Sequence, residues 1–143
     1  MAPMDRIEDC ISFLVGKAAQ QVAWRARDKL APYDVTPTRY AVLKVLWDQD
    51  GQSAADVGVR LVIDSATITG VIDRLEASGL LERRRDGEDR RVQRLYLTRK
   101  GRALQKPLDR VMDQVNDEVR AILGKQAPGL WRGLRRLGSA EEA

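Results

Sequence analysis

Histidine is absent from this sequence of 143 residues, and cysteine occurs only once, at Cys10. Zinc sites built from cysteine and histidine, disulfides within the chain and serine–histidine catalysis all need residues that the sequence does not offer. An enzyme would have to work with carboxylates, lysine or tyrosine, and no paired carboxylates occur where a cleft is expected. We therefore expect no metal site, no cofactor and no enzymatic activity.

Long apolar runs are missing as well. No stretch approaches the roughly 20 consecutive residues that cross a bilayer, and the first ten residues are charged where a signal peptide would be apolar. The sequence thus predicts no membrane partner and a cytoplasmic location. With 43% hydrophobic residues, it is long enough for one domain with a real core, and two full domains are not expected.

Positive charge is concentrated in one part of the chain. The net charge of the whole sequence is only +4. Between Arg74 and Arg102, however, ten arginines and lysines stand against five acidic residues. This short segment carries the whole excess, so its local structure decides what the charge is for.

Apolar residues at three- and four-residue steps predict two long helices near the ends of the chain, over about residues 5–30 and 99–123, and a short final helix over 128–137. Thr36, Ser53, Asp64 and Thr98 are each placed to cap the start of a helix. In the short helix after Ser53, Ala55, Val59 and either Leu61 or Val62 are predicted to face inward. The helix after Asp64 is predicted to bury Ile68, Val71, Ile72 and Leu75 and to end at Gly79.

After Gly79 the pattern changes from helical to extended. Two strands are predicted, through Leu80-Leu81 and through 92–97, with turn-forming residues 86–89 between them. Leu95 and Leu97 share one face of the second strand and should anchor this hairpin to the core. A short helix followed by a basic two-stranded projection fits duplex DNA, with the helix in the major groove and the projection against the backbone or minor groove.

This order of elements, with its punctuating residues, resembles the MarR family of bacterial transcriptional regulators. The resemblance rests on Val35-Thr36-Pro37-Thr38-Arg39-Tyr40-Ala41-Val42-Leu43, Asp73-Arg74-Leu75-Glu76 before Gly79-Leu80, and Asp89-Arg90-Arg91 before Leu97-Thr98-Arg99-Lys100-Gly101. It implies a single domain over 1–143 that is mainly α with a small β-hairpin wing. A winged helix-turn-helix module over about 36–98 would be joined to the N- and C-terminal dimerisation helices, and the protein would be a homodimer.

The predicted DNA contacts lie in the helix after Asp64 and in the wing. Ser65, Thr67 and Thr69 are the base-proximal candidates, because small hydroxyl residues let a helix sit deep in the groove and can bond to bases or phosphates. Arg90 and Arg91, nearest the tip of the wing, could enter the minor groove. By resemblance, Arg91 is the better candidate for that contact and Asp89 braces the loop. The full predicted set is Ser53, Ser65, Ala66, Thr67, Thr69, Gly70, Arg74, Arg83, Arg84, Arg85, Asp89, Arg90 and Arg91.

Two roles are open for Arg74, which could contact phosphate or hold the wing through Asp86 or Asp89. Arg83, Arg84 and Arg85 are expected to touch phosphates or to neutralise the acidic loop beside them. Taken alone, hydroxyls near a helix start can simply cap amides, and a charged hairpin can simply be a solvated surface.

The resemblance also implies a small aromatic or phenolic effector that binds between the dimerisation helices and the winged module and releases DNA. Trp24 and Tyr40 are candidates to stack on its ring, and Arg39 is a candidate partner for a carboxylate. These three can equally be ordinary core aromatics and a surface charge.

Cys10 suggests a different signal, because one branch of the family resembles organic-peroxide sensors with a reactive cysteine early in the first helix. Cys10 lies about one helical turn too early for that role, and Glu8 and Asp9 beside it disfavour a thiolate. The main prediction is therefore a ligand-responsive repressor that binds a pseudo-palindromic operator. Redox sensing through Cys10, or a winged-helix module used for protein contact, are the alternatives.

Overall fold

The computed structural model describes residues 3–139, so the first two and last four residues of the predicted domain over 1–143 lie outside the described residues. Its elements in chain order are η1 (Ile7–Asp9), α1 (Ile11–Leu30), η2 (Ala31–Tyr33), α2 (Pro37–Asp48), α3 (Ala54–Leu61), α4 (Ser65–Ala77), β1 (Leu81–Arg85), β2 (Gln93–Leu97), α5 (Arg99–Ala103), α6 (Gln105–Leu123), η3 (Gly124–Gln126) and α7 (Ala127–Gly138). The predicted fold class, mainly α with a β-hairpin, is confirmed. None of the helices of the described part is long and apolar enough to cross a membrane.

Four helices begin where the sequence places a capping residue. The side chain of Thr36 accepts a hydrogen bond from the amide of Arg39, and Ser53, Asp64 and Thr98 do the same for the amide three residues further on. Each cap satisfies a backbone donor that the first turn of a helix leaves without a partner. These contacts fix where α2, α3, α4 and α5 start.

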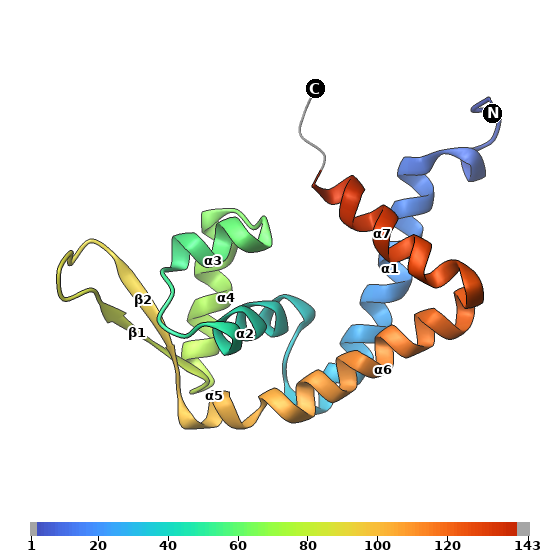
Figure 1. The fold of residues 1–143 in the computed structure, drawn as a ribbon. Coiled ribbons are helices and arrows are strands. Elements are labelled where there is room, and N and C mark those ends of the chain that lie inside the picture. Colours follow the sequence, from blue (N-terminus) through green and yellow to red (C-terminus); the bar gives the residue numbers. More distant parts are fainter. Residues whose placement is uncertain (1–2, 140–143) are drawn as a thin grey trace.

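One hydrophobic core holds α2, α3, α4, the hairpin and the start of α6 together. Its members that are almost fully inaccessible to solvent come from all of these elements and from the end of α1: Leu30, Val42, Leu43, Leu46, Val57, Ile72, Leu75, Leu81, Leu95 and Leu108. The predicted anchoring of the hairpin is confirmed, because Leu95 and Leu97 are 0% and 6% exposed. In Figure 1 this winged module lies on the left and the hairpin projects away from it.

The hairpin is held at its base by a third short segment. β1 and β2 pair antiparallel, with Leu81 opposite Leu97 and Arg85 opposite Gln93. Before α3, the amide of Gly51 donates to the carbonyl of Leu95 (2.9 Å), and the amide of Leu95 donates to the carbonyl of Gln52 (2.9 Å). Gly51 has φ +78°, and a Cβ there would lie 3.0 Å from the Tyr96 ring. Glycine is required at this turn on both grounds.

The other part of the molecule is built from α1, α6 and α7, on the right of Figure 1. The first half of α6 packs in the core of the winged module through Leu108, whereas Val115 and Glu118 belong to the half that meets α1. Glu118 accepts from Arg25 (3.2 Å) and from Lys29 (2.8 Å). α6 is therefore shared by the two parts.

Three predictions about helices need correction. The first helix begins at Ile11 and not near residue 5, since Cys10 has an extended backbone (ψ 118°) that separates it from η1. The helix predicted over 99–123 is divided at Leu104 into α5 and α6. Val59 in α3 and Val62 directly after it are 79% and 91% exposed.

Ala55 is also exposed, so the predicted inward positions Ala55, Val59 and Val62 are wrong, whereas Leu61, the other option, packs against the core. The buried residues of that helix are Val57 and Gly58. The chain turns back over Gly58, where the amide of Ile63 donates to its carbonyl (2.9 Å). A helix of only eight residues admits two apolar stripes, and packing against α4 selects one of them.

Candidate nucleic-acid interface

The face of α4 that points away from the core is exposed along its length. Ile68, Ile72 and Leu75 are buried, as predicted, while the opposite stripe is formed by Ala66, Thr69, Gly70 and Asp73. These four positions follow the three- and four-residue spacing of a single helix face. Of the three base-proximal candidates, Thr69 lies on this stripe, and Ser65 and Thr67 are exposed on either side of it.

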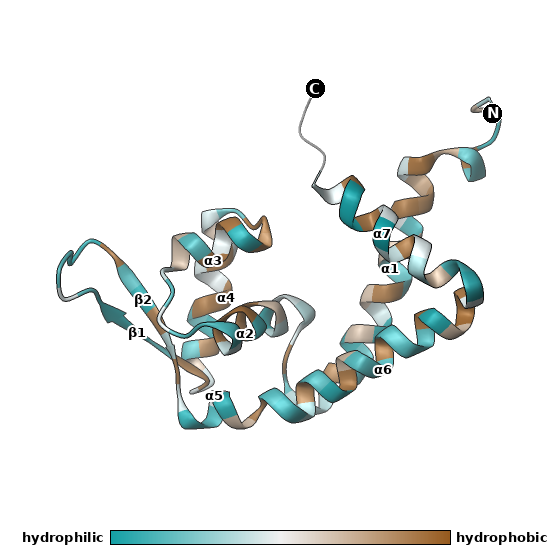
Figure 2. Cartoon of the chain, viewed as in Figure 1, coloured by the Kyte–Doolittle hydropathy of each residue, from teal (hydrophilic) through white to brown (hydrophobic). Residues whose placement is uncertain are grey.

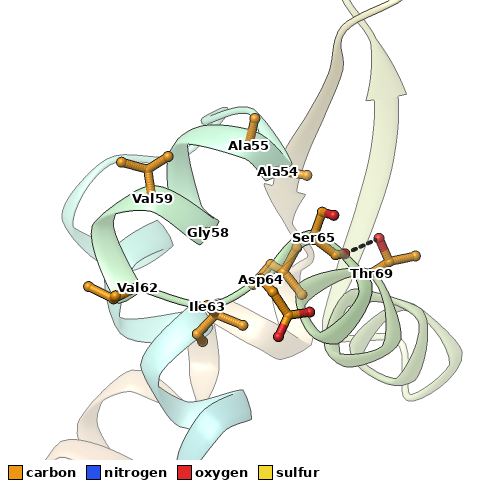
Figure 3. Close-up of a pocket in the computed structure, with 10 residues that line it drawn as sticks. Ala54, Ala55, Gly58, Val59, Val62, Ile63, Asp64, Ser65 and Thr69 are labelled. Atoms are coloured by element: carbon orange, nitrogen blue, oxygen red, sulfur yellow. Dashed lines mark hydrogen bonds between the residues drawn. The ribbon is translucent and has the colours of Figure 1, made fainter.

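Two of the three hydroxyl groups on this helix are already donating within the protein. Thr67 donates from Oγ1 to Oδ2 of Asp64 (2.9 Å), and Thr69 donates from Oγ1 to the carbonyl of Ser65 (2.7 Å; Figure 3). Hydrogen bonds from Thr67 hold the pKa of the Asp64 carboxyl below its usual range. The predicted hydroxyl donors are therefore reduced to Ser65.

Arg83 on β1 ties the wing to α4. Its guanidinium pairs with Asp73 and with Glu76 (2.7 Å), and its backbone amide donates to Glu76 (3.1 Å). Only 19% of the Arg83 side chain is exposed. This is a correction, because Arg83 was expected to touch phosphate or to neutralise the acidic loop, and its partners lie on the recognition helix instead.

Arg74 does not take the bracing role that was one of its two options. Within residues 3–139, its guanidinium makes no ion pair with Asp86 or Asp89. Arg94 holds Asp86 through a hydrogen bond from Nε (3.0 Å) and also donates to the carbonyl of Gly51 (3.1 Å). A hydrogen bond from the amide of Glu88, and then Arg94, lower the pKa of the Asp86 carboxyl. The sequence counted Arg94 only as one charge of the basic segment and missed this role.

At the wing tip, Asp89 and Arg91 form a local unit. Both the amide and Nε of Arg91 donate to Oδ1 of Asp89 at 3.1 Å, which lowers the pKa of the Asp89 carboxyl. The Arg91 side chain is nevertheless 91% exposed. Arg84 differs, because it pairs with Glu82 and its guanidinium lies 4.5 Å from the centre of the Tyr96 ring.

Two hollows lie on either side of the first turn of α3, and both are lined by Ala54 and Ala55. The one towards the wing, of about 460 Å³, contains Ser53, Arg85, Arg90, Arg91, Val92 and Gln93, and we call it the basic hollow. The other, of about 620 Å³, continues through Gly58, Val59, Val62, Ile63, Asp64, Ser65, Ile68 and Thr69 and is mostly hydrocarbon; we call it the apolar hollow (Figure 3). Three arginines around one concave surface make the basic hollow suitable for a phosphate of the DNA backbone.

The residues predicted to bind an effector are placed in different surroundings. Trp24 on α1 is 58% exposed. Arg39 donates to the carbonyl of Asp34 (3.5 Å) at the junction of α1 and α2. Tyr40 points to α6, where its hydroxyl donates to Asp109 (2.7 Å), and burial together with that carboxylate raises the Tyr40 pKa.

Lys44, one turn after Tyr40, donates to the other oxygen of Asp109 (2.9 Å). Asp109 therefore accepts from two side chains of α2 and fixes that helix to α6. Sequence reasoning missed both Lys44 and Asp109, and the signal available was the four-residue spacing of Tyr40 and Lys44 on one helix face. The candidate redox residue, Cys10, lies at the N-terminal boundary of α1 and is partly buried.

Comparison with known proteins agrees with this architecture. Residues 35–92 match the model of the MarR family. The transcriptional regulator TtmR of Methylorubrum extorquens is 37% identical, over 94% of this chain and 73% of its own length.

Solved structures agree as well. A probable transcriptional regulator from Pseudomonas aeruginosa has a TM-score of 0.85 and 31% identity, over 92% of this chain and 99% of that one. BpsR of Bordetella bronchiseptica has a TM-score of 0.89 and 28% identity, over 98% and 100% of the two chains. The chain described here therefore belongs to the MarR family, and it is a DNA-binding transcriptional regulator with no enzymatic activity.

Proposed function

We propose that this regulator is a homodimeric repressor that binds a pseudo-palindromic operator. The observation that carries the proposal is the exposed apolar surface of α1 and α7. Ile11, Leu14, Leu134 and Leu137 are 68%, 43%, 49% and 58% exposed, and Figure 2 shows apolar residues along these helices. A second copy related by a two-fold axis would cover such a surface and would present two recognition helices to successive major grooves.

The proposed DNA contacts follow from the accessible surfaces described above. Ser65, Ala66, Thr69 and Gly70 face the base edges. The phosphate contacts are Ser53, Arg74, Arg85 and Arg90, and Arg91 reaches the minor groove. Arg83, Arg84, Asp89 and Thr67 shape this surface from within the protein.

The proposed effector is a small aromatic or phenolic acid. In BpsR, which shares the fold of this chain, 6-hydroxynicotinic acid regulates DNA binding. Arg39 offers a cation for a carboxylate, and Trp24 and Tyr40 offer rings. The ligand would favour a dimer in which the spacing of the recognition helices no longer matches the operator.

The proposal is tested with duplex DNA from the region upstream of the gene. Binding measured by mobility shift should weaken steeply with added salt, and sedimentation should give the mass of a dimer. Leu134→Glu should yield a monomer that binds the same duplex much more weakly. A monomeric wild-type protein, or no salt-dependent binding, would contradict the proposal.

A thermal-shift screen of aromatic acids and phenols tests the effector. A ligand that prefers the native state raises the melting temperature, and it should also release the duplex. Deleting the gene should raise transcription from the bound promoter if the protein represses it.

A further inference from the structure

Apart from the hydroxyl of Ser65, the base-facing surface of α4 has little capacity to donate hydrogen bonds. Ala66 and Gly70 have no polar side-chain atoms, and the hydroxyl of Thr69 is turned back to the carbonyl of Ser65. Asp73, at the far end of this stripe, is paired with Arg83. Reading guanine in the major groove calls for arginine or lysine, and reading adenine calls for asparagine or glutamine. None of these residue types stands on the stripe.

Thr69 instead presents a methyl group to solvent. Because its Oγ1 is held by the helix backbone, the methyl group is the part of the side chain that points away from α4, as Figure 3 shows. A threonine in this state resembles an apolar residue towards anything that approaches the helix.

The apolar hollow continues this apolar character from α4 to α3. Thr69 and Ser65 line its α4 side, and Val59 and Val62 line its α3 side. Those two valines are 79% and 91% exposed, so hydrocarbon is accessible next to the recognition helix and is available for contact with a bound partner.

The position of the basic hollow indicates what covers the apolar one. Ala54 and Ala55 line both, so the first turn of α3 is a ridge with arginines on one side and hydrocarbon on the other. A DNA strand that lays its phosphates against Arg85 and Arg90 places its sugars and base edges across this ridge. The occupant of the apolar side is then a part of DNA that is itself apolar.

We propose that Thr69 is a specificity-determining residue that reads the 5-methyl group of a thymine, which lies against the apolar hollow. Thymine is the base whose methyl group stands in the major groove. The inference rests on the proposed docking of α4 in that groove, and it adds the base that is recognised and the atom that recognises it.

The test removes the methyl group from each partner in turn, first from thymine in the DNA and then from Thr69 in the protein, and compares the affinities. A duplex is first selected with the wild-type protein from a random library, and its thymines are then replaced by deoxyuridine, one at a time and together. In each half-site one replacement should weaken binding about fourfold, the effect of one buried methyl group. Other replacements should have little effect.

Thr69→Ser removes the protein's methyl group and keeps the hydroxyl that bonds to Ser65. In this variant the thymine and deoxyuridine duplexes should bind almost equally. Thr67→Ser is the matched control, because it makes the same chemical change at a hydroxyl that donates to Asp64, on a flank of α4, and it should keep the fourfold difference.

Two results would overturn the inference while leaving operator binding intact. One is equal affinity of the wild type for thymine and deoxyuridine duplexes, and the other is an unchanged fourfold difference in Thr69→Ser. Failure to select any duplex would instead overturn the proposed operator binding on which the inference rests.

Discussion

Arg83 and Arg91 lie on the same hairpin, and their side chains are 19% and 91% exposed. Truncating each side chain to alanine should therefore affect a different property, stability for Arg83 and DNA binding for Arg91. Arg83→Ala leaves Asp73 and Glu76 without their cation and should lower the free energy of unfolding by about 1–2 kcal/mol. Arg91→Ala should leave stability unchanged and make the dependence of DNA affinity on salt shallower, by about one unit of slope for each phosphate that the variant no longer neutralises.

Urea unfolding and salt titrations of binding measure the two effects separately. Loss of stability in Arg91→Ala would show that the tip also supports the fold. Arg74→Ala belongs to the same series, and it should behave like Arg91→Ala because its guanidinium has no protein partner among residues 3–139.

A substitution at Gly70 should change stability and DNA affinity in opposite directions. A Cβ at this position would meet nothing within 4 Å, so Gly70→Ala should raise the free energy of unfolding by about 0.5–1 kcal/mol through better helix propensity. DNA affinity should fall, because the added methyl group keeps α4 further from the bases. A more stable variant with unchanged affinity would place Gly70 outside the interface.

At the scale of single residues, the sequence was a better guide to which residues share a surface than to which hydrogen-bond partner each side chain takes. It predicted that the arginines of the wing and the hydroxyls of α4 form one DNA-binding surface, and the basic hollow brings Arg85, Arg90 and Arg91 together. It could not tell that Arg83 turns to α4 or that Thr69 turns to its own backbone. The first depends on the distance between β1 and α4, which no local pattern encodes. The second is a local contact, because a threonine in a helix can bond to the carbonyl four residues earlier.

Among the elements, α5 meets the hairpin at an unusually close approach. A Cβ on Gly101 would lie 2.0 Å from the carbonyl oxygen of Leu80. Gly101→Ala must therefore push α5 away from β1 and should lower the free energy of unfolding by about 3 kcal/mol or more. Gly70→Ala is the control in the same urea experiment, and equal stability of the two variants would contradict this packing.

The pairing of α1 with α6 makes stability depend on pH. Hydrogen bonds from Lys29 and Arg25 hold the pKa of Glu118 below its ordinary value of 4.5. The ionised form is thus favoured in the folded protein. Its contribution is fully present above about pH 4.5 and is lost as the pH falls through the lowered pKa.

Glu118→Gln should accordingly flatten the decline of the melting temperature between about pH 5 and pH 3. Asp117→Asn is the matched control, because this neighbouring carboxylate, among the residues that the structure describes, pairs only with Arg120 on its own helix. An identical pH profile for wild type and Glu118→Gln would show that the pair is not part of the folded state in solution.

Helix order and most helix starts were predictable because capping residues, glycines and prolines mark them. The break at Cys10 was not, since it has no proline or glycine beside it. The break at Leu104 does have a signal, which the sequence reasoning missed: Pro107 has no amide hydrogen to donate to the carbonyl of Ala103, four residues earlier, so the helical hydrogen bonding is interrupted there. The predicted inward positions of α3 were wrong because the turn over Gly58 depends on α4.

For the whole molecule, the sequence predicted a winged module and long terminal helices, and the structure adds how they are joined. Tyr40 and Lys44 hold Asp109 on α6, and Leu108 beside it is completely buried in the core of the winged module. The apolar spacing of a helix predicts one buried face and does not say what covers it. That the first turns of α6 pack in the winged module and the later turns pack on α1 could therefore not be predicted from the sequence.

This sharing has a consequence for how the protein unfolds. Leu108 and Val115 are 0% and 2% exposed and lie two turns apart on one continuous helix. Melting either part therefore removes support from the other, so the winged module should not open on its own. Native-state hydrogen exchange should find the slowest amides of α2, α4 and the middle of α6 exchanging with a single free energy, as one cooperative unit.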